Sequence, residues 1–234
     1  MAERYSQRAF TRPPGATEII MVRHGASADA VPGQPFDLID GHGDPPLSPV
    51  GLEQAQAVGE RLAGEPLAAL FVTGLTRTVQ TAAPLAERTG LDPMVVPELR
   101  EVRLGDWEGG EFRIRAQSGD PIAMRAIAEE RWDLIPGAET MDELADRVRR
   151  GIDALLSRTG PDAVCVAVLH GGVIGEVCRQ ATGSRPFAFV HSDNCSLSRL
   201  VVLPDGRRLL RSFNDTAHLM GSTVSGSLVS ARDD

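Results

Sequence analysis

The sequence predicts an α/β fold, a three-layer α/β/α sandwich with a mostly parallel central sheet. Apolar runs at 18–23, 67–72 and 163–169 have the length and composition of buried strands. Amphipathic segments of helical period separate these runs, which is the pattern of parallel strands joined by helices. Of the 234 residues 42% are hydrophobic, which is enough for a core without disulfides or metals.

Each element follows from its own periodicity and end signals. Ser48 before Pro49 is typical of a helix N-terminus, and Gly90 is typical of a residue that ends a helix. The expected strands are 18–23, 67–72, 94–96, 163–169, 197–203 and 207–213, the last two forming a hairpin. One helix is expected to begin at Pro49, and three further helices are expected at 75–89, 140–156 and 172–181.

The remaining segments lack a regular period. Residues 26–47 are rich in proline and are expected to form a long irregular loop, of a length that is usually functional or mobile. Residues 102–137 are expected to form an irregular helical insertion. We expect a flexible N-terminal extension at 1–17 and a flexible C-terminal tail at 216–234. No internal boundary divides the rest, so a single domain at 18–215 is expected.

Composition excludes several classes of function. A formal net charge of −8 argues against non-specific binding to nucleic acid or an anionic membrane. The longest apolar run, 163–169, is too short to span a bilayer, and the N-terminus lacks the apolar core of a secretory signal. The number of cysteines is odd and no Cys-x-x-Cys pair occurs, so we expect the cysteines to be small core residues of a protein in a reducing compartment. A cytoplasmic protein is therefore expected.

Polar residues follow three of the predicted strands. Arg23, His24 and Gly25 come after the first strand, Arg77 after the second and His170 after the third. The carboxyl ends of parallel strands meet at one edge of a sheet, where helix N-termini also point N–H groups toward a bound anion. Arginine forks and histidines gathered there predict a phosphate site.

Longer motifs surround these residues and occur in a fixed order. They are Val22-Arg23-His24-Gly25, Pro46 to Ala55, Leu75 to Ala82, Glu98 to Glu101, Gly105 to Gly109, and Leu169-His170-Gly171-Gly172. In these motifs the chain resembles the histidine phosphatase superfamily, the phosphoglycerate-mutase-like proteins. The resemblance covers roughly residues 18–215 and implies that the 102–137 insertion lies over the active site.

The resemblance implies a role for each residue of the site. His24 is the nucleophile that becomes a phosphohistidine, Arg23, Arg77 and His170 bind the phosphoryl oxygens, and Glu101 is the general acid. The attacking nitrogen of His24 must be unprotonated, so its other nitrogen should donate to a backbone carbonyl, for which Gly25 is a candidate. The arginines replace a metal, so neither a metal nor another cofactor is expected.

Some positions depart from the family pattern. Ala30 stands where many relatives have asparagine, and Ser27 and His42 are candidates to replace its contact with the substrate. Arg103 and Arg113, with Arg115 and Arg125, are candidates to contact a second acidic group, although a solvated, ion-paired helix face is the commoner role for each. Thr73 replaces a serine of the family, and Trp107 is expected to anchor the insertion.

Several functions remain open at this stage. A phosphatase acting on a small phosphorylated metabolite is favoured over a phosphoglycerate mutase, because Gly172 follows the second histidine motif where the mutases have asparagine. A metal-dependent hydrolase using His24, His42, Asp44 and His170 lacks paired ligand spacing. A non-catalytic phosphate-binding module is disfavoured because all five catalytic positions are intact. A homodimer is expected only from the family resemblance.

Overall fold

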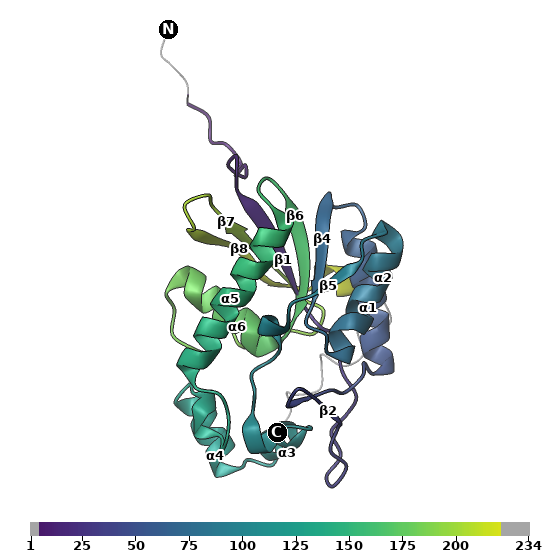
Figure 1. Ribbon diagram of the computed structural model, residues 1–234, viewed down its shortest axis with the longest axis vertical. Helices are drawn as coiled ribbons and strands as arrows, with labels where there is room; N and C mark the ends of the chain where they lie inside the picture. Colours follow the sequence, from purple (N-terminus) through teal and green to yellow (C-terminus); the bar gives the residue numbers. More distant parts are fainter. Residues whose placement is uncertain (1–4, 221–234) are drawn as a thin grey trace.

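The structure, a computed structural model, describes residues 5–220 and is built around a six-stranded sheet (Figure 1). Its strands are β1 (Thr17–Arg23), β4 (Leu67–Val72), β5 (Pro93–Val95), β6 (Val164–Leu169), β7 (Leu197–Val202) and β8 (Arg208–Asp215). The strand order is β5-β4-β6-β1-β7-β8. β5, β4, β6 and β1 pair in parallel, whereas β7 is antiparallel to both of its neighbours. The predicted mostly parallel sheet and the C-terminal hairpin are therefore confirmed.

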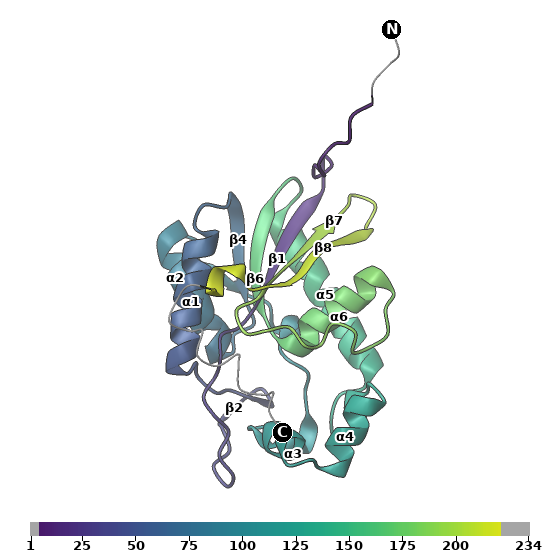
Figure 2. The ribbon, with the colours of Figure 1, turned by 180° about the vertical axis from the view of Figure 1, so that it is seen from behind.

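Helices cover both faces of this sheet (Figures 1 and 2). α1 (Pro49–Leu62) and α2 (Thr76–Thr89) lie on one face, and α5 (Met141–Thr159) and α6 (Gly171–Thr182) on the other. Alternate side chains of β1 serve the two layers, since Ile20 and Val22 pack with α1 and α2 while Ile19 and Met21 pack with α5 and α6. The predicted three-layer α/β/α sandwich is thus confirmed.

Local end signals fix where the helices begin and stop. Ser48 Oγ accepts a hydrogen bond from the Gly51 amide at 3.1 Å, so Ser48 caps α1 as predicted. Gly90 ends α2 with a φ of 72°, the left-handed region that glycine adopts without a steric penalty. Thr140 and Glu143 form a reciprocal capping box at the start of α5, which extends three residues beyond the predicted end at 156.

The 102–137 segment forms a small helical body beyond the carboxyl ends of the strands (Figure 1). It contains η2 (Gly105–Trp107), α3 (Glu111–Gln117), α4 (Pro121–Ala128) and η3 (Trp132–Leu134), and the short η1 (Pro97–Leu99) precedes it. Trp107 is 3% exposed and packs with Ala123, Ala126 and Ile135 in a separate hydrophobic cluster. Trp107 therefore anchors the insertion, as the sequence predicted.

Loop 26–47 and the described residues that flank the domain make regular contacts with it. Loop 26–47 contains a two-stranded ribbon of β2 (Leu38–Ile39) and β3 (His42–Gly43). Arg12 donates to the carbonyls of Asp162 and Ala163, and Thr17 already begins β1. At the other end η4 (Ala217–Leu219) packs against α1, and the remainder of the expected tail lies outside the described residues.

The three cysteines lie in the core, as the sequence predicted. Cys165, Cys178 and Cys195 are buried free thiols, and burial raises the pKa of each to about 12. None of the helices within residues 5–220 combines the length and the apolar character that crossing a bilayer requires.

Candidate active site

Three adjacent strands end in the polar residues of the candidate site. β1 leads into His24, β4 into Thr73 and β6 into His170, and these strands are neighbours in the sheet. The rings of His24 and His170 lie 5.2 Å apart between centroids, edge to face. Both histidines are buried, with exposed fractions of 5% and 0%. The sheet therefore brings together two residues that are separated by most of the catalytic domain's sequence.

His24 is held in one tautomer by the backbone. Its Nδ1 lies 2.8 Å from the carbonyl oxygen of Gly25, so Nδ1 carries the proton and Nε2 is unprotonated. The predicted role of the Gly25 carbonyl is thus present in the geometry. Burial, followed by the charges of Arg77 and Arg23, lowers the pKa of His24 well below its ordinary value of 6.5. The imidazole is therefore neutral at physiological pH.

A tight turn places His24 in this position. A Cβ on Gly25 would lie 2.6 Å from the Gly51 carbonyl oxygen, and one on Gly51 would lie 2.0 Å from the Ala26 carbonyl oxygen. The chain after β1 and the first turn of α1 thus touch backbone to backbone, which only glycine allows. This contact explains why glycines occur in both motifs.

Arg77 binds the attacking side of His24. Its Nε donates to His24 Nε2 at 3.3 Å, and its Nη1 donates to the Gly43 carbonyl at 2.9 Å. The Asp44 carboxylate lies 4.0 Å from the same Nη1 and also caps α2 by accepting from Thr76 N at 2.7 Å. Loop 26–47 therefore fixes the guanidinium that faces Nε2 of His24.

Arg23 and His170 each have one buried polar atom without a hydrogen-bond partner. Arg23 Nη1 donates to the Ser192 carbonyl, while Arg23 Nε is buried without a hydrogen-bond partner. His170 Nε2 lies 2.9 Å from Thr73 Oγ1, while His170 Nδ1 is likewise buried and unpartnered. Buried polar atoms normally have partners, so both atoms are available to a group that binds beside them.

Glu101 lies on the side of the site that is formed by the N-terminus of α6. Its Oε1 accepts from Val102 N at 3.0 Å and from Gly172 N at 3.1 Å, at the N-terminus of α6. A Cβ on Gly172 would lie 2.7 Å from Glu101 Oε1, so the absence of a side chain there makes room for the carboxylate. Glu101 and the second histidine motif therefore form one structural unit.

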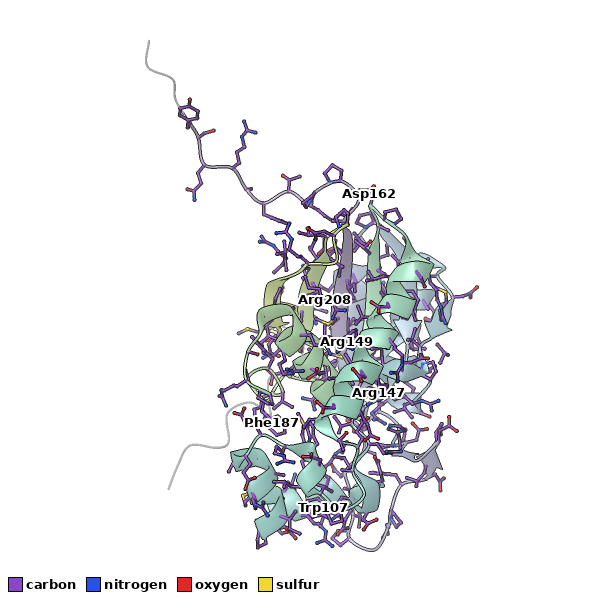
Figure 3. All side chains as sticks on the ribbon, turned by 60° about the vertical axis from the view of Figure 1, so that its left-hand side comes forward. Trp107, Arg147, Arg149, Asp162, Phe187 and Arg208 are labelled. Carbon is purple, nitrogen blue, oxygen red and sulfur yellow. The ribbon has the colours of Figure 1, made fainter. Side chains whose placement is uncertain are left out.

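A half-buried arginine that sequence reasoning missed supports Glu101. Arg147 of α5 donates to the carbonyls of Glu98, Arg100 and Glu101 and forms an ion pair with Glu139 at 2.5 Å. Figure 3 shows Arg147 on α5, on the side that approaches the insertion. In sequence Arg147 looked like the polar side of an amphipathic helix. The only available signal was its position one turn after the capping box that opens α5.

The catalytic side chains line a cavity of about 240 Å³ beneath the insertion. Among its lining residues are Arg23, His24, Arg77, Glu101, His42 and Arg113. Arg113 donates to Ser27 Oγ at 2.6 Å and to the Ala28 carbonyl at 3.0 Å, which connects the insertion to loop 26–47. His42 Nδ1 faces the Asp40 carbonyl, and its Nε2 is buried and unpartnered. His42 and Arg113 thus reach the cavity, whereas Ser27 reaches it through Arg113.

The structure does not bring the other candidate arginines to this cavity. Arg103 lines a separate surface pocket with Glu139 and Glu143. Arg115 pairs with Glu111 and Asp120, and Arg125 pairs with Glu129 on the exposed side of α4. These ion pairs correspond to the commoner, solvated alternative weighed for each residue.

The contacts of the described residues can be compared with the metal site that the hydrolase alternative requires. Within residues 5–220, no three His, Cys, Asp or Glu side chains gather so that they could hold a metal ion. Asp44, which the metal-hydrolase alternative required, instead binds Thr76 N and Oγ1.

Comparison with known proteins decides the family. The sequence profile described as "Histidine phosphatase superfamily (branch 1)" matches residues 19–216. The chain belongs to this superfamily. It is accordingly an enzyme of the histidine-phosphatase type, and the resemblance inferred from the motifs is confirmed.

Individual relatives fall on both sides of the phosphatase and mutase division. The chain is 31% identical over 207 residues to a metal-independent phosphoserine phosphatase of Arabidopsis thaliana, covering 87% of this chain and 83% of that one. It is 30% identical over 209 residues to a probable phosphoglycerate mutase, GpmB, of Yersinia enterocolitica, covering 86% and 94%. A solved mycobacterial glucosyl-3-phosphoglycerate phosphatase matches with a TM-score of 0.69 and 28% identity, over 86% of this chain and all of that one.

Proposed function

We propose that this protein is a metal-independent phosphomonoester hydrolase that acts through a phosphohistidine at His24. The observation that carries the proposal is the fixed tautomer of His24. Its Nδ1 lies 2.8 Å from the Gly25 carbonyl oxygen, and its unprotonated Nε2 accepts a hydrogen bond from Arg77. A buried neutral imidazole flanked by guanidinium groups is suited to attack on phosphorus. Phosphoryl transfer depends mainly on such alignment and charge stabilisation.

In the first step the Nε2 lone pair of His24 forms a bond to phosphorus as the bond to the ester oxygen breaks. Glu101, protonated in the substrate complex, transfers its proton to the departing oxygen, and the alcohol leaves. In the second step a water oxygen attacks phosphorus, Glu101 accepts the proton of that water, and the N–P bond breaks. Inorganic phosphate leaves, and His24 and Glu101 return to their starting states.

The phosphoryl oxygens are bound by guanidinium groups that gather at the cavity. Arg23 Nε is buried and unpartnered, so a phosphoryl oxygen satisfies it. Arg77 donates to the nucleophile across a long 3.3 Å contact and can turn to the phosphate when the N–P bond forms. Arg113 adds a third guanidinium to the lining of the cavity. Arginines thus supply the positive charge that metal ions provide in other phosphoryl-transfer enzymes.

His170 acts in this scheme as a charged donor. Thr78 Oγ1 donates to the Leu75 carbonyl at 2.7 Å, so it accepts from Thr73 Oγ1. Thr73 in turn accepts from His170 Nε2, which leaves His170 Nδ1 without a proton when the ring is neutral. To donate to a phosphoryl oxygen, Nδ1 must take up a proton, and the phosphate dianion stabilises that imidazolium.

The mutase remains the second candidate because one relative is a probable phosphoglycerate mutase. A mutase must retain its phosphorylated intermediate and exclude water, whereas a phosphatase must admit water to phosphohistidine. The carboxylate of Glu101 lies beside Gly172, at the boundary between the catalytic cavity and a second cavity of about 330 Å³. This second space offers water a route to the general base, which favours hydrolysis.

The covalent intermediate is the direct test. After rapid acid-free quenching, mass spectrometry of the enzyme with a phosphomonoester should locate acid-labile phosphate on His24, and His24→Ala should neither label nor release phosphate. Parallel assays should show phosphate release exceeding 3-phosphoglycerate isomerisation. Isomerisation with negligible hydrolysis would establish the mutase instead. A wild-type protein that binds phosphate but never labels would leave only a binding module.

A further inference from the structure

The second cavity beside Glu101 has the character of a hydrophobic chamber. It measures about 330 Å³ and shares Arg23, Glu101 and Phe112 with the catalytic cavity. We call this second cavity the aromatic chamber. The residues that line it, and do not line the catalytic cavity, are Ala116, Ile127, Trp132, Gly171, Gly172, Phe187, Val190 and His191. One wall comes from the insertion, and the other from the start of α6 and the segment after it.

A row of aromatic rings connects the catalytic cavity to this chamber. Phe112 lies 6.4 Å from Trp107 and 5.8 Å from Trp132, and Trp132 lies 4.5 Å from Phe187, each between ring centroids. Figure 3 shows Trp107 in the insertion and Phe187 on the facing segment. Aromatic residues make up only 4% of the sequence, so four rings in one row concentrate them at this boundary.

The two walls of the chamber are already joined in the free protein. Glu130, just after α4, forms an ion pair with Arg185 and accepts from the Phe187 amide at 3.3 Å. These contacts cross from the insertion to the segment after α6. A chamber held open by such contacts binds a ligand without first having to order its own walls.

The charge distribution of the chamber restricts what it accepts. Of its lining residues, the ionisable ones are Arg23, Glu101 and His191. Arg23 and Glu101 belong to the boundary with the phosphate site, and His191 lies exposed at the rim. No lining residue is left to pair with a carboxylate or ammonium group deep in the chamber, and burying such a group unpaired is costly.

The reaction geometry places the alcohol of the substrate here. The leaving oxygen departs on the side of phosphorus opposite His24 Nε2, and it must lie within reach of Glu101 to receive a proton. Glu101 and Gly172 stand between the catalytic cavity and the chamber. The group attached to the leaving oxygen therefore continues past Glu101 and Phe112 into the chamber.

We infer that the aromatic chamber is the leaving-group site and that the substrate is a phosphomonoester of an uncharged, largely apolar alcohol. This inference rests on the proposed phosphatase function and narrows its substrate class. It differs from what the names of two relatives say they act on, phosphoserine and glucosyl-3-phosphoglycerate, since both of those compounds carry charged groups beside the phosphate.

Matched substrates test the inference. Ethyl phosphate and 2-phenylethyl phosphate both release a primary alcohol, so they differ chiefly in the ring that the chamber would bury. We expect kcat/KM to be on the order of 10- to 100-fold higher for 2-phenylethyl phosphate, the effect of burying one aromatic ring. O-phosphoserine should be no better than ethyl phosphate. Equal values for the first two compounds, or a preference for phosphoserine, would overturn the inference.

Matched variants locate the effect. Ile127 and Met124 lie one turn apart on α4 and are 41% and 42% exposed, but only Ile127 lines the chamber. Ile127→Asp should lower the ratio of the two kcat/KM values several-fold, whereas Met124→Asp should leave it unchanged. Val190→Phe, which fills the chamber from the opposite wall, should also lower the ratio. An unchanged ratio in both chamber variants, with folding verified by thermal melting, would contradict the assignment.

The labelling of His24 separates this inference from the proposed function. If ethyl phosphate phosphorylates His24 but the ring confers no advantage, the phosphatase assignment holds and the leaving-group assignment fails. If no phosphomonoester labels His24 or releases phosphate, the proposed function itself fails.

Discussion

Arg77 donates a hydrogen bond from Nε to Nε2 of His24, across 3.3 Å, so a cation occupies the lone pair that would attack phosphorus. The same guanidinium donates to the Gly43 carbonyl and lies near Asp44, which fixes its plane. Arg77 therefore orients the imidazole in the free enzyme and keeps it neutral. When substrate enters, the phosphoryl group must take the place of this contact at Nε2.

This double role makes Arg77 sensitive to a conservative change. Lysine keeps the charge but lacks the planar fork, so Arg77→Lys cannot serve His24, Gly43 and a phosphoryl oxygen together. We expect kcat to fall about 10²–10³-fold, the usual effect of removing one preorganised transition-state donor. Steady-state kinetics on one phosphomonoester measures this. Arg88→Lys, at an exposed ion pair on the same helix, is the matched control and should retain wild-type kcat.

Gly172 provides a steric test of Glu101. A methyl group there would lie 2.7 Å from Glu101 Oε1, so Gly172→Ala should displace the carboxylate from the leaving oxygen. We expect kcat/KM for an alkyl phosphate to fall about 10²-fold or more, within the range for a lost general acid. An aryl phosphate, whose leaving group needs less protonation, should lose much less. Gly64→Ala is the control, since a Cβ at Gly64 meets nothing within 4 Å.

Glu101→Gln distinguishes protonation from positioning in the same assay. The amide fills the same space but has no proton to transfer as an acid. The alkyl and aryl phosphates should therefore separate as they do in Gly172→Ala. If both variants lowered kcat/KM for the two substrates equally, protonation of the leaving oxygen by Glu101 would be ruled out.

The sequence was most informative where function depends on residues next to strand ends. Arg23, His24 and His170 follow strands that are recognisable from their apolar runs, and parallel pairing alone then brings them together. The glycines at 25 and 51 were visible as motif residues. Their reason, a backbone contact too close for a Cβ, required coordinates.

Contacts between distant surfaces were less predictable. Arg103 and Arg113 have similar neighbours in the sequence, since each stands between two apolar residues and two positions after a glutamate. In the structure, however, Arg113 lines the catalytic cavity and Arg103 lines a separate pocket. The difference arises from how the insertion folds on its own Trp107 cluster, which no local periodicity encodes. The aromatic chamber was hidden for the same reason, because its walls come from segments far apart in the chain.

Phosphate binding should be accompanied by proton uptake at His170. Its Nδ1 is unpartnered, and burial, followed by Arg77 and His24, lowers the pKa of His170 well below 6.5 in the free protein. A bound dianion reverses that balance. Calorimetry of inorganic phosphate at pH 8 in buffers of different ionisation enthalpy should show net uptake of up to about one proton. The uptake should be smaller in His170→Asn than in the wild type and should be unchanged in His24→Asn, because any proton taken up by Glu101 remains in both variants. Buffer-independent heats in the wild type would rule out this protonation.

The same histidines should make the free protein sensitive to acid. Their folded pKa values lie below the unfolded value of about 6.5, so the unfolded chain binds more protons as the pH falls below that value. The free energy of unfolding should be greatest above pH 6.5 and decline from there toward the lowered folded pKa. Urea unfolding at pH 7.5, 6.0 and 5.0 measures the decline. It should be shallower in His24→Asn and His170→Asn, and equal slopes in all three proteins would contradict it.

Arg147 should matter both for stability and for catalysis. Its side chain is 17% exposed and that of Glu139 is 6% exposed, so the ion pair between them is largely removed from water. Arg147→Met leaves Glu139 and the carbonyls of the Glu98–Glu101 turn without their donor, and it should lower the free energy of unfolding by about 3–5 kcal/mol. Arg149→Met removes an exposed ion pair on the same helix and should cost under about 1 kcal/mol.

The catalytic effect of Arg147 should depend on the leaving group. Arg147 holds the backbone of Glu101 and does not line the catalytic cavity, so its loss should lower kcat for alkyl phosphates more than for aryl phosphates while inorganic phosphate still binds. Assays below the melting temperature of Arg147→Met separate this effect from unfolding. A purely structural role predicts instead that all substrates slow in proportion to the folded fraction. Retention of the wild-type ratio of alkyl to aryl rates would therefore show that Arg147 stabilises the fold without positioning Glu101.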